Sequence, residues 1–254
     1  MIKDILTRYI NYMISGDAEK ARALFFDKPR LDIPERGKIL GEVAFMHFVS
    51  QRSEWMSASV MQMEHVATTM TDDRIVEEYI LNLKQFDKTY ELPIAVVADL
   101  IEEKLYRVRV YYSLWSLQQK HQIRKPILKK MDDLAFPLVI QCYQQALRQG
   151  DLDTILAQFA KDAIVREPAG GHYIHRGSEQ IKQFYQALFS NGGGVVLDYC
   201  SVTDDGEHCA IEYNVIQWGR DTLPAQAGIA VYEYKDELLT AVRIYDDVDP
   251  PIHL

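Results

Sequence analysis

The chain carries the same pattern twice, at a constant offset of 134 residues. Sliding the sequence against itself by this distance superposes identical residues along the greater part of each half: Tyr9 on Tyr143, Gly16 on Gly150, Asp17 on Asp151, Phe25 on Phe159, Glu78 on Glu212 and Arg109 on Arg243. This period is far longer than that of solenoid repeats, so each copy is expected to own a complete hydrophobic core. The repeat predicts two tandem domains of the same fold.

The boundary between the copies is predicted from a change in pattern. Residues 116–133 read "SLQQKHQIRKPILKKMDD", where apolar periodicity weakens and a proline appears. We therefore predict domains at 1–115 and 134–254, joined by a linker at 116–133. The linker holds a basic cluster that is expected to be solvated: Lys120, Arg124, Lys125, Lys129 and Lys130.

Composition narrows the range of partners. The formal net charge of −9 argues against nucleic acid or an anionic membrane as the main partner, because both bind basic surfaces. The opening "MIKDILTRYI" lacks the apolar core of a signal peptide, and no apolar run approaches the ~20 residues of a membrane helix. The three cysteines lack metal-type spacing, which favours core positions in a reduced, cytoplasmic protein.

The second copy shows helical patterns first and strand patterns afterwards. Apolar residues recur with helical spacing over 136–148 and 178–189, and a short helix is predicted from Asp151 through Phe159. Residues 195–202, 208–218, 227–234 and 238–246 alternate and are rich in Val, Ile and Tyr, which predicts strands. Helices followed by an antiparallel sheet indicate an α+β fold with the helices on one face.

One stretch of the second copy resembles a known family. "VIQCYQQALRQGDLDTILAQFAKDAIVREPAGG" followed by "RGSEQIKQFY" is similar to the opening of bacterial ketosteroid isomerases and of the SnoaL-like, nuclear-transport-factor-2-like superfamily. The resemblance implies two tandem cones, each a curved, mostly antiparallel sheet wrapped by three N-terminal helices around an apolar pocket. It also implies an intrachain pseudo-dimer through the outer sheet faces, and leaves a homo-oligomer open. The superfamily includes isomerases, cyclases, dehydratases, epoxide hydrolases and non-enzymatic binders, so the fold alone does not name a reaction.

The resemblance implies three catalytic positions in the second copy. Glu167, before Pro168, falls where the family places its proton-shuttling carboxylate, Tyr143 on the oxyanion-binding tyrosine and Tyr185 on a supporting tyrosine. Such chemistry needs a base and a hydrogen-bond donor for the developing enolate oxygen. The alternatives are a surface Glu167 paired to Arg166 or Arg176, and a Tyr143 that is an inward aromatic bonded to the backbone.

Strand alternation predicts which other side chains line the cone. With Ala230 inward, as the resemblance implies, the predicted ligand-binding set is Tyr213, Ala230, Tyr232, Ile244 and Asp246. Ala230 stands where the family has a second, acidic oxyanion donor, which is a departure from the pattern. Asp246 is either a second acid or a solvated strand terminus. The repeated Glu78, Glu212, Arg109 and Arg243 are expected on the outer faces, where the two copies pair.

The first copy lacks the acid of the second. Ile33 falls near the position of Glu167 and Val49 at that of Tyr185, so its cone is expected to be apolar and catalytically empty. His172 and His175 lie in "GGHYIHRG" and are expected to be exposed loop residues, because no further metal ligand has convincing spacing. No nucleotide motif appears, so neither a metal nor another cofactor is predicted.

Two classes of function remain. The first is binding of a small apolar molecule in the second domain, with cofactor-independent proton transfer of the isomerase or cyclase type on a ketone or enol. The second is a non-catalytic ligand-binding or protein-interaction module on a pseudo-dimeric scaffold. The set of Glu167, Tyr143 and Tyr185 favours the first, whereas Ala230 favours the second.

Overall fold

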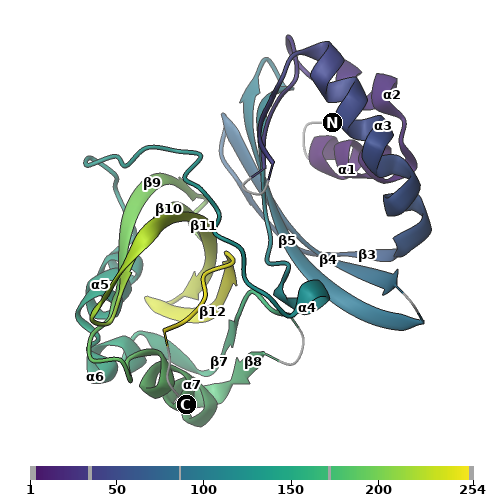
Figure 1. Ribbon diagram of the computed structural model, residues 1–254. Helices are drawn as coiled ribbons and strands as arrows, with labels where there is room; N and C mark the ends of the chain where they lie inside the picture. The colour runs from purple at the N-terminus through teal and green to yellow at the C-terminus, as the bar shows by residue number, and fades with distance from the viewer. Residues whose placement is uncertain (1–3, 34–35, 86, 171–172, 252–254) are drawn as a thin grey trace. The chain divides into compact units, whose positions relative to one another are not determined.

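The computed structural model describes residues 4–33, 36–85, 87–170 and 173–251. The chain divides into two compact units, Met1–Tyr112 (unit 1) and Ser113–Leu254 (unit 2). Each unit has one six-stranded sheet with helices packed on one of its faces, as Figure 1 shows for each unit by itself. The predicted α+β class and the helix-wrapped, mostly antiparallel sheets are confirmed.

The elements of unit 1 follow one another as α1 (Ile5–Ser15), α2 (Ala18–Ala23), β1 (Arg30–Ile33), β2 (Gly37–Leu40), α3 (Glu42–Ser59), β3 (Val60–Met70), β4 (Arg74–Gln85), β5 (Lys88–Ile101) and β6 (Lys104–Tyr111). Its sheet has the order β2-β1-β6-β5-β4-β3.

Unit 2 contains α4 (Trp115–Gln118), α5 (Leu138–Gln149), α6 (Leu152–Leu156), β7 (Phe159–Arg166), β8 (Ile174–Arg176), α7 (Gly177–Leu188), β9 (Val195–Asp204), β10 (His208–Trp218), β11 (Asp221–Lys235) and β12 (Leu238–Tyr245). The order of its sheet, β8-β7-β12-β11-β10-β9, repeats that of unit 1 strand for strand.

The repeated Gly-Asp pair makes the corner between the first two helices of each unit. Gly150 ends α5 with a φ of 70°, in the left-handed region that favours glycine, and the Asp151 carboxylate then accepts from the Thr154 backbone N–H at 3.1 Å. Gly16 and Asp17 do the same between α1 and α2. The pair is therefore repeated because it turns the chain, independently of any chemistry in the pocket.

The second predicted helix is too long. We expected it to run from Asp151 through Phe159, whereas α6 ends at Leu156 and Phe159 begins β7. β7 lies parallel to β12, with Val165 opposite Val242, and β8 pairs antiparallel to β7. Neither β7 nor β8 was expected. β7 places Glu167 immediately after the end of a strand inside the sheet.

The predicted linker packs on unit 2. The Met131 N–H donates to the Tyr199 carbonyl at 2.9 Å, and the Ala227 N–H donates to the Arg124 carbonyl at 2.7 Å. The expectation of a solvated basic cluster is wrong for Arg124, which is 2% exposed. It holds for the four lysines, whose side chains are exposed: Lys120, Lys125, Lys129 and Lys130.

Unit 1 contains a buried acid that the expectation of an empty apolar cone missed. Ile33 and Val49 are buried, as an apolar cone requires. Glu77 on β4 is also buried and accepts a hydrogen bond from Tyr79, and the Thr7 hydroxyl on α1 lies 3.0 Å from the Tyr79 hydroxyl. The Thr7 hydroxyl also donates to Glu77 Oε2 at 3.4 Å, so Glu77 lies on the face of the sheet that α1 covers. Burial raises its pKa to about 7, and Thr7 opposes the shift.

Glu77 should make unit 1 less stable at high pH. A carboxyl whose pKa is raised on folding stabilises the fold below its unfolded pKa, and this contribution disappears as pH rises through the folded value. We expect Glu77→Gln to be neutral near pH 4 and to stabilise unit 1 by about 3 kcal/mol at pH 8. Hydrogen exchange of β4 peptides in urea, at both pH values, measures this difference. The exposed Glu91→Gln on β5 is the control. An equal effect of Glu77→Gln at both pH values would show that Glu77 does not titrate in this range.

Candidate functional site

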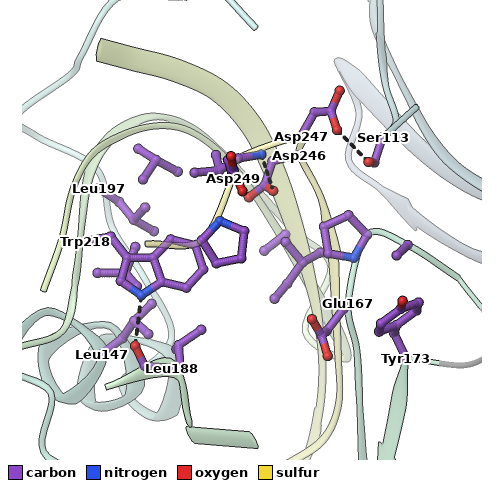
Figure 2. Close-up of a pocket in the computed structure, with 18 of the residues that line it drawn as sticks. Ser113, Leu147, Glu167, Tyr173, Leu188, Leu197, Trp218, Asp246, Asp247 and Asp249 are labelled. Atoms are coloured by element: carbon purple, nitrogen blue, oxygen red, sulfur yellow. Dashed lines mark hydrogen bonds between the residues drawn. The ribbon is translucent and has the colours of Figure 1, made fainter. Parts of the chain in front are cut away.

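A cavity of about 480 Å³ lies within unit 2. Its walls come from helices α5 and α7, from the inner face of β9–β12, and from the segments 113–121 and 246–250 (Figure 2). Most of the lining is aliphatic or aromatic, which is the composition of a site for a small organic molecule. The described lining residues that the sequence singled out are Tyr143, Glu167, Tyr185, Tyr213, Ala230, Tyr232, Ile244 and Asp246.

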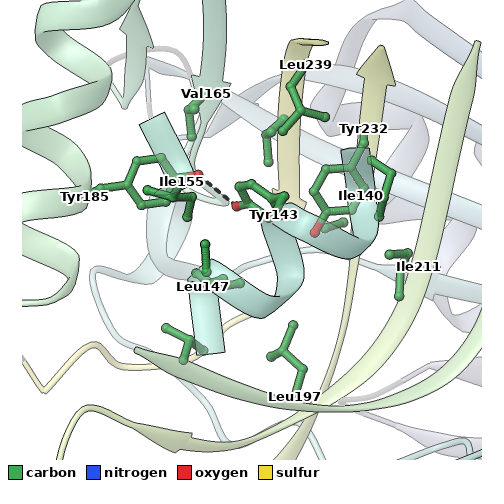
Figure 3. Close-up of a cluster of buried hydrophobic side chains, with 14 of the residues drawn as sticks. Ile140, Tyr143, Leu147, Ile155, Val165, Tyr185, Leu197, Ile211, Tyr232 and Leu239 are labelled. Atoms are coloured by element: carbon green, nitrogen blue, oxygen red, sulfur yellow. Dashed lines mark hydrogen bonds between the residues drawn. The ribbon is translucent and has the colours of Figure 1, made fainter. Parts of the chain in front are cut away.

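Tyr143 and Tyr185 form one hydrogen-bonded pair in the wall of the cavity. Their hydroxyl oxygens are 2.7 Å apart, and both residues are buried (Figure 3). Tyr143 therefore pairs with a side chain rather than with the backbone. Burial raises the pKa of both phenols well above the ordinary value, so both remain protonated. If Tyr185 donates to Tyr143, the Tyr143 proton is available to a ligand.

Glu167 lines the cavity but pairs with a residue that was not expected. Its Oε1 lies 2.6 Å from His175 Nε2, and its side chain is 32% exposed. The predicted alternative, pairing with Arg166 or Arg176, is wrong: Arg166 is directed to the Tyr245 hydroxyl and ring, Arg176 is exposed, and the partner of Glu167 is His175. Glu167 therefore lies beside Tyr173 as a half-exposed carboxylate oriented by an imidazole (Figure 2).

His175 is part of the sheet and not of an exposed loop. It lies in β8, and its ring stacks on Phe184 of α7 with centroids 4.6 Å apart. This stacking holds the ring in place, so that Nε2 meets Glu167. His172, the other histidine of the motif, lies outside the described residues. Within the described ranges, no group of three or more His, Cys, Asp or Glu residues has the geometry of a metal site.

Asp246 lies in the cavity wall and is not a solvated strand terminus. The Tyr213 hydroxyl donates to Asp246 Oδ2 at 2.9 Å. Burial raises the pKa of Asp246 to about 6, although this hydrogen bond lowers it. Gly228 makes room for the pair, since a Cβ there would lie 2.6 Å from the Tyr213 ring and 2.8 Å from Asp246 Cβ. The sequence analysis had predicted that Tyr213 and Asp246 both face the cavity.

The segment before α5 closes one side of the cavity, which the sequence did not indicate. The next acid, Asp247, is fully buried and accepts a hydrogen bond from Ser113 Oγ at 2.6 Å. It also forms an ion pair with Arg124 at 2.8 Å and lies 3.2 Å from His121 Nδ1. The His121 ring stacks on Trp115, and both line the cavity. Asp247 raises the pKa of His121 through their hydrogen bond. The only local signal was an aromatic residue and a histidine inside a segment of linker-like composition.

The outward residues of the same strands do not reach the described lining of the cavity. Glu212 accepts from Ser201, and Arg243 pairs with Glu233 at 2.6 Å. Their alternation with Tyr213 and Asp246 agrees with the expected register. The pairing of the two copies through these faces stays a prediction.

Comparison with known families agrees with this geometry. Residues 139–242, which run from α5 into β12 and carry most of the cavity wall, match the model of the SnoaL-like domain. We call this part of unit 2, whose sequence matches that family, the SnoaL-like domain. The resemblance inferred from the sequence is thereby confirmed for the second copy.

Solved structures similar to a part of this chain come from several bacteria. One is a candidate polyketide cyclase from Sinorhizobium meliloti, with 22% identity over 43% of this chain and 94% of that chain and a TM-score of 0.37. Another is a protein from Catenulispora acidiphila with a ketosteroid isomerase-like fold, solved in complex with trimethylamine. It is 13% identical over 46% of this chain and 90% of that chain, with a TM-score of 0.40. A third is an LEH-like epoxide hydrolase from M. tuberculosis, which is 19% identical over 43% of this chain and 80% of that chain, with a TM-score of 0.37.

None of the helices in the described part of the chain is long and apolar enough to cross a membrane.

Proposed function

We propose that the SnoaL-like domain binds a small, largely apolar organic molecule and catalyses cofactor-independent proton transfer on it. The observation that supports this function is the meeting of Glu167, Tyr143 and Tyr185 at the lining of one apolar cavity. A cavity of about 480 Å³ suits a ligand of small-drug size.

Each residue has a separate role in the proposed reaction. The Glu167 carboxylate takes a proton from the carbon next to a carbonyl, and the electron pair of that C–H bond moves to form an enolate. A protonated Tyr143, supported by Tyr185, donates to the enolate oxygen. Glu167 then returns the proton to carbon. His175 is a positioning residue, because it holds the Glu167 carboxylate without touching the substrate.

Non-catalytic binding is the second candidate function. It is favoured by Ala230, which lines the cavity at the family's second donor position and offers no polar group. A single tyrosine would then stabilise the enolate, which predicts slow turnover at best. A domain of this kind would bind its ligand without any exchange of protons on carbon.

The test follows deuterium uptake by an enolisable probe, cyclohexyl methyl ketone, in heavy water by NMR. If Glu167 is the base, Glu167→Gln should slow exchange at least about 100-fold, because the amide keeps the shape and loses the proton acceptor. Binding of the non-enolisable cyclohexylmethanol should change less than about threefold. The exposed Glu179→Gln on α7 removes the same charge outside the cavity and should behave as the wild type. Exchange that persists in Glu167→Gln refutes the catalytic role, and binding without exchange in the wild type identifies a binder.

A further inference from the structure

We propose that the ligand of the SnoaL-like domain carries a positive charge, as an amine or ammonium group attached to an apolar body, and that Asp246 is its counter-ion. This inference rests on the proposed function in one respect, namely that the cavity holds a small organic molecule. It adds the chemical class of that molecule.

The charged groups that line the cavity are mostly acidic. The described lining contains four carboxylates, and neither lysine nor arginine is among its described members. The carboxylates are Glu167, Asp246, Asp247 and Asp249, and the titratable base among the described lining residues is His121. A ligand with a carboxylate would meet charges of its own sign, in a site where apolar walls screen them poorly.

Asp246 differs from the other acids in its partners. Glu167 pairs with His175, and Asp247 pairs with Arg124. The side chain of Asp249 is 84% exposed, so water solvates its charge. Asp246 accepts only from neutral groups, the Tyr213 hydroxyl and the Val248 backbone N–H, and forms no ion pair with any described residue. A half-buried carboxylate whose hydrogen bonds come only from neutral donors is stabilised when a ligand cation lies beside it.

The aromatic lining suits a cation as well. Trp115 stacks flat on His121, and the Trp218 indole N–H donates to the Leu188 carbonyl at 2.8 Å, which fixes its ring at the wall (Figure 2). The face of an aromatic ring attracts an ammonium group within about 6 Å. Aromatic rings and one unpaired carboxylate together select an organic cation over a neutral molecule of the same shape.

The inference has a consequence for pH. The groups that face Asp246 are the Tyr213 hydroxyl, the Asp247 carboxylate and the His121 imidazole. An amine binds best when Asp246 is ionised, so its affinity should fall as pH drops through about 6. Protonation of His121 adds positive charge to the wall and acts in the same direction. A neutral ligand should show no such fall.

Three probes with the same body and different charges test the proposal by calorimetry on the full chain: cyclohexylmethylamine, cyclohexylmethanol and cyclohexanecarboxylate. At pH 7.5 the amine should bind at least about tenfold tighter than the alcohol, and the carboxylate weaker than both. Asp246→Asn should reduce the preference for the amine to within about twofold. The matched control Asp236→Asn, at the exposed turn between β11 and β12, should leave it unchanged. The affinity of the wild type for the amine should fall at least about fivefold between pH 7.5 and pH 5. This measurement tests Asp246 even if the variant does not fold.

The outcomes separate this inference from the proposed function. If the alcohol binds as tightly as the amine, or the carboxylate binds tightest, the cationic ligand class is overturned while the cavity remains a binding site. A preference for the amine that survives in Asp246→Asn refutes Asp246 as the counter-ion. If none of the three probes binds, the proposed binding function fails together with the inference.

Discussion

Arg124→Met should lower the free energy of unfolding of unit 2 by about 3–5 kcal/mol, the range for removing one partner of a buried ion pair. Arg124 is 2% exposed and faces the fully buried Asp247 at 2.8 Å. The methionine replaces the volume of the arginine stem but leaves the Asp247 charge with weaker partners. The loss should appear in urea unfolding followed by hydrogen exchange of unit 2 peptides.

Two further variants show whether charge is the cause. Lys125→Met removes the neighbouring positive charge, which is exposed, and should cost less than about 0.5 kcal/mol. Adding Asp247→Asn to Arg124→Met should recover at least about 1 kcal/mol, because the uncompensated charge is then gone. An Arg124→Met protein as stable as Lys125→Met would mean that the pair contributes little to holding the segment 113–124 on the cavity.

Gly194→Ala should destabilise unit 2 by about 3 kcal/mol or more, at the upper end of the cost of overpacking. The loop before β9 lies against the end of α5 so closely that a Cβ on Gly194 would be 1.8 Å from the Leu147 carbonyl oxygen and 2.6 Å from the Gly150 nitrogen. Both contacts are backbone atoms, so no side-chain rotation relieves them. Either the loop or the last turn of the helix that carries Tyr143 must move.

The measurement is hydrogen exchange of α5 and β9 peptides, which should lose protection together. Gly206→Ala is the control, because its Cβ would meet nothing within 4 Å and only its φ of 93° disfavours a side chain. That variant should cost about 1 kcal/mol. A Gly194→Ala protein no less stable than Gly206→Ala would show that the helix end and the loop adjust freely.

The inner face of the sheet was predictable because strands alternate with a period of two. Once the family resemblance had placed Ala230 inward, alternation gave Tyr232 on the same strand and Tyr213 on β10, and the resemblance gave Asp246 directly after β12. The helices were predictable for a similar reason, since Tyr143 and Tyr185 lie on apolar stripes of regular spacing. The face that a residue occupies is a local property of the sequence.

The partners of the site residues were not predictable, because they depend on distant segments. His121 meets Asp247 across 126 positions of sequence, and nothing local to either residue indicates the other. β7 was missed for the same reason: its stabilising neighbour is β12, a parallel strand that only the tertiary fold supplies. The partner of Glu167 was misjudged because His175 and Arg176 are adjacent in the chain, and only the pairing of β7 with β8, which was not expected, decides which of them meets the carboxylate.

The position of β12 decides when the SnoaL-like domain is completed during synthesis. The last strand of this sheet to be synthesised, β12, lies between β7 and β11, so β7 has no neighbour on that side until residues 238–245 are available. β6 has the same place in unit 1. Closing so long a loop is slow and leaves apolar strand edges uncovered meanwhile. Because Ile244 and Asp246 arrive with β12 and the residue after it, a nascent chain can fold unit 1 to completion while unit 2 still has no binding cavity.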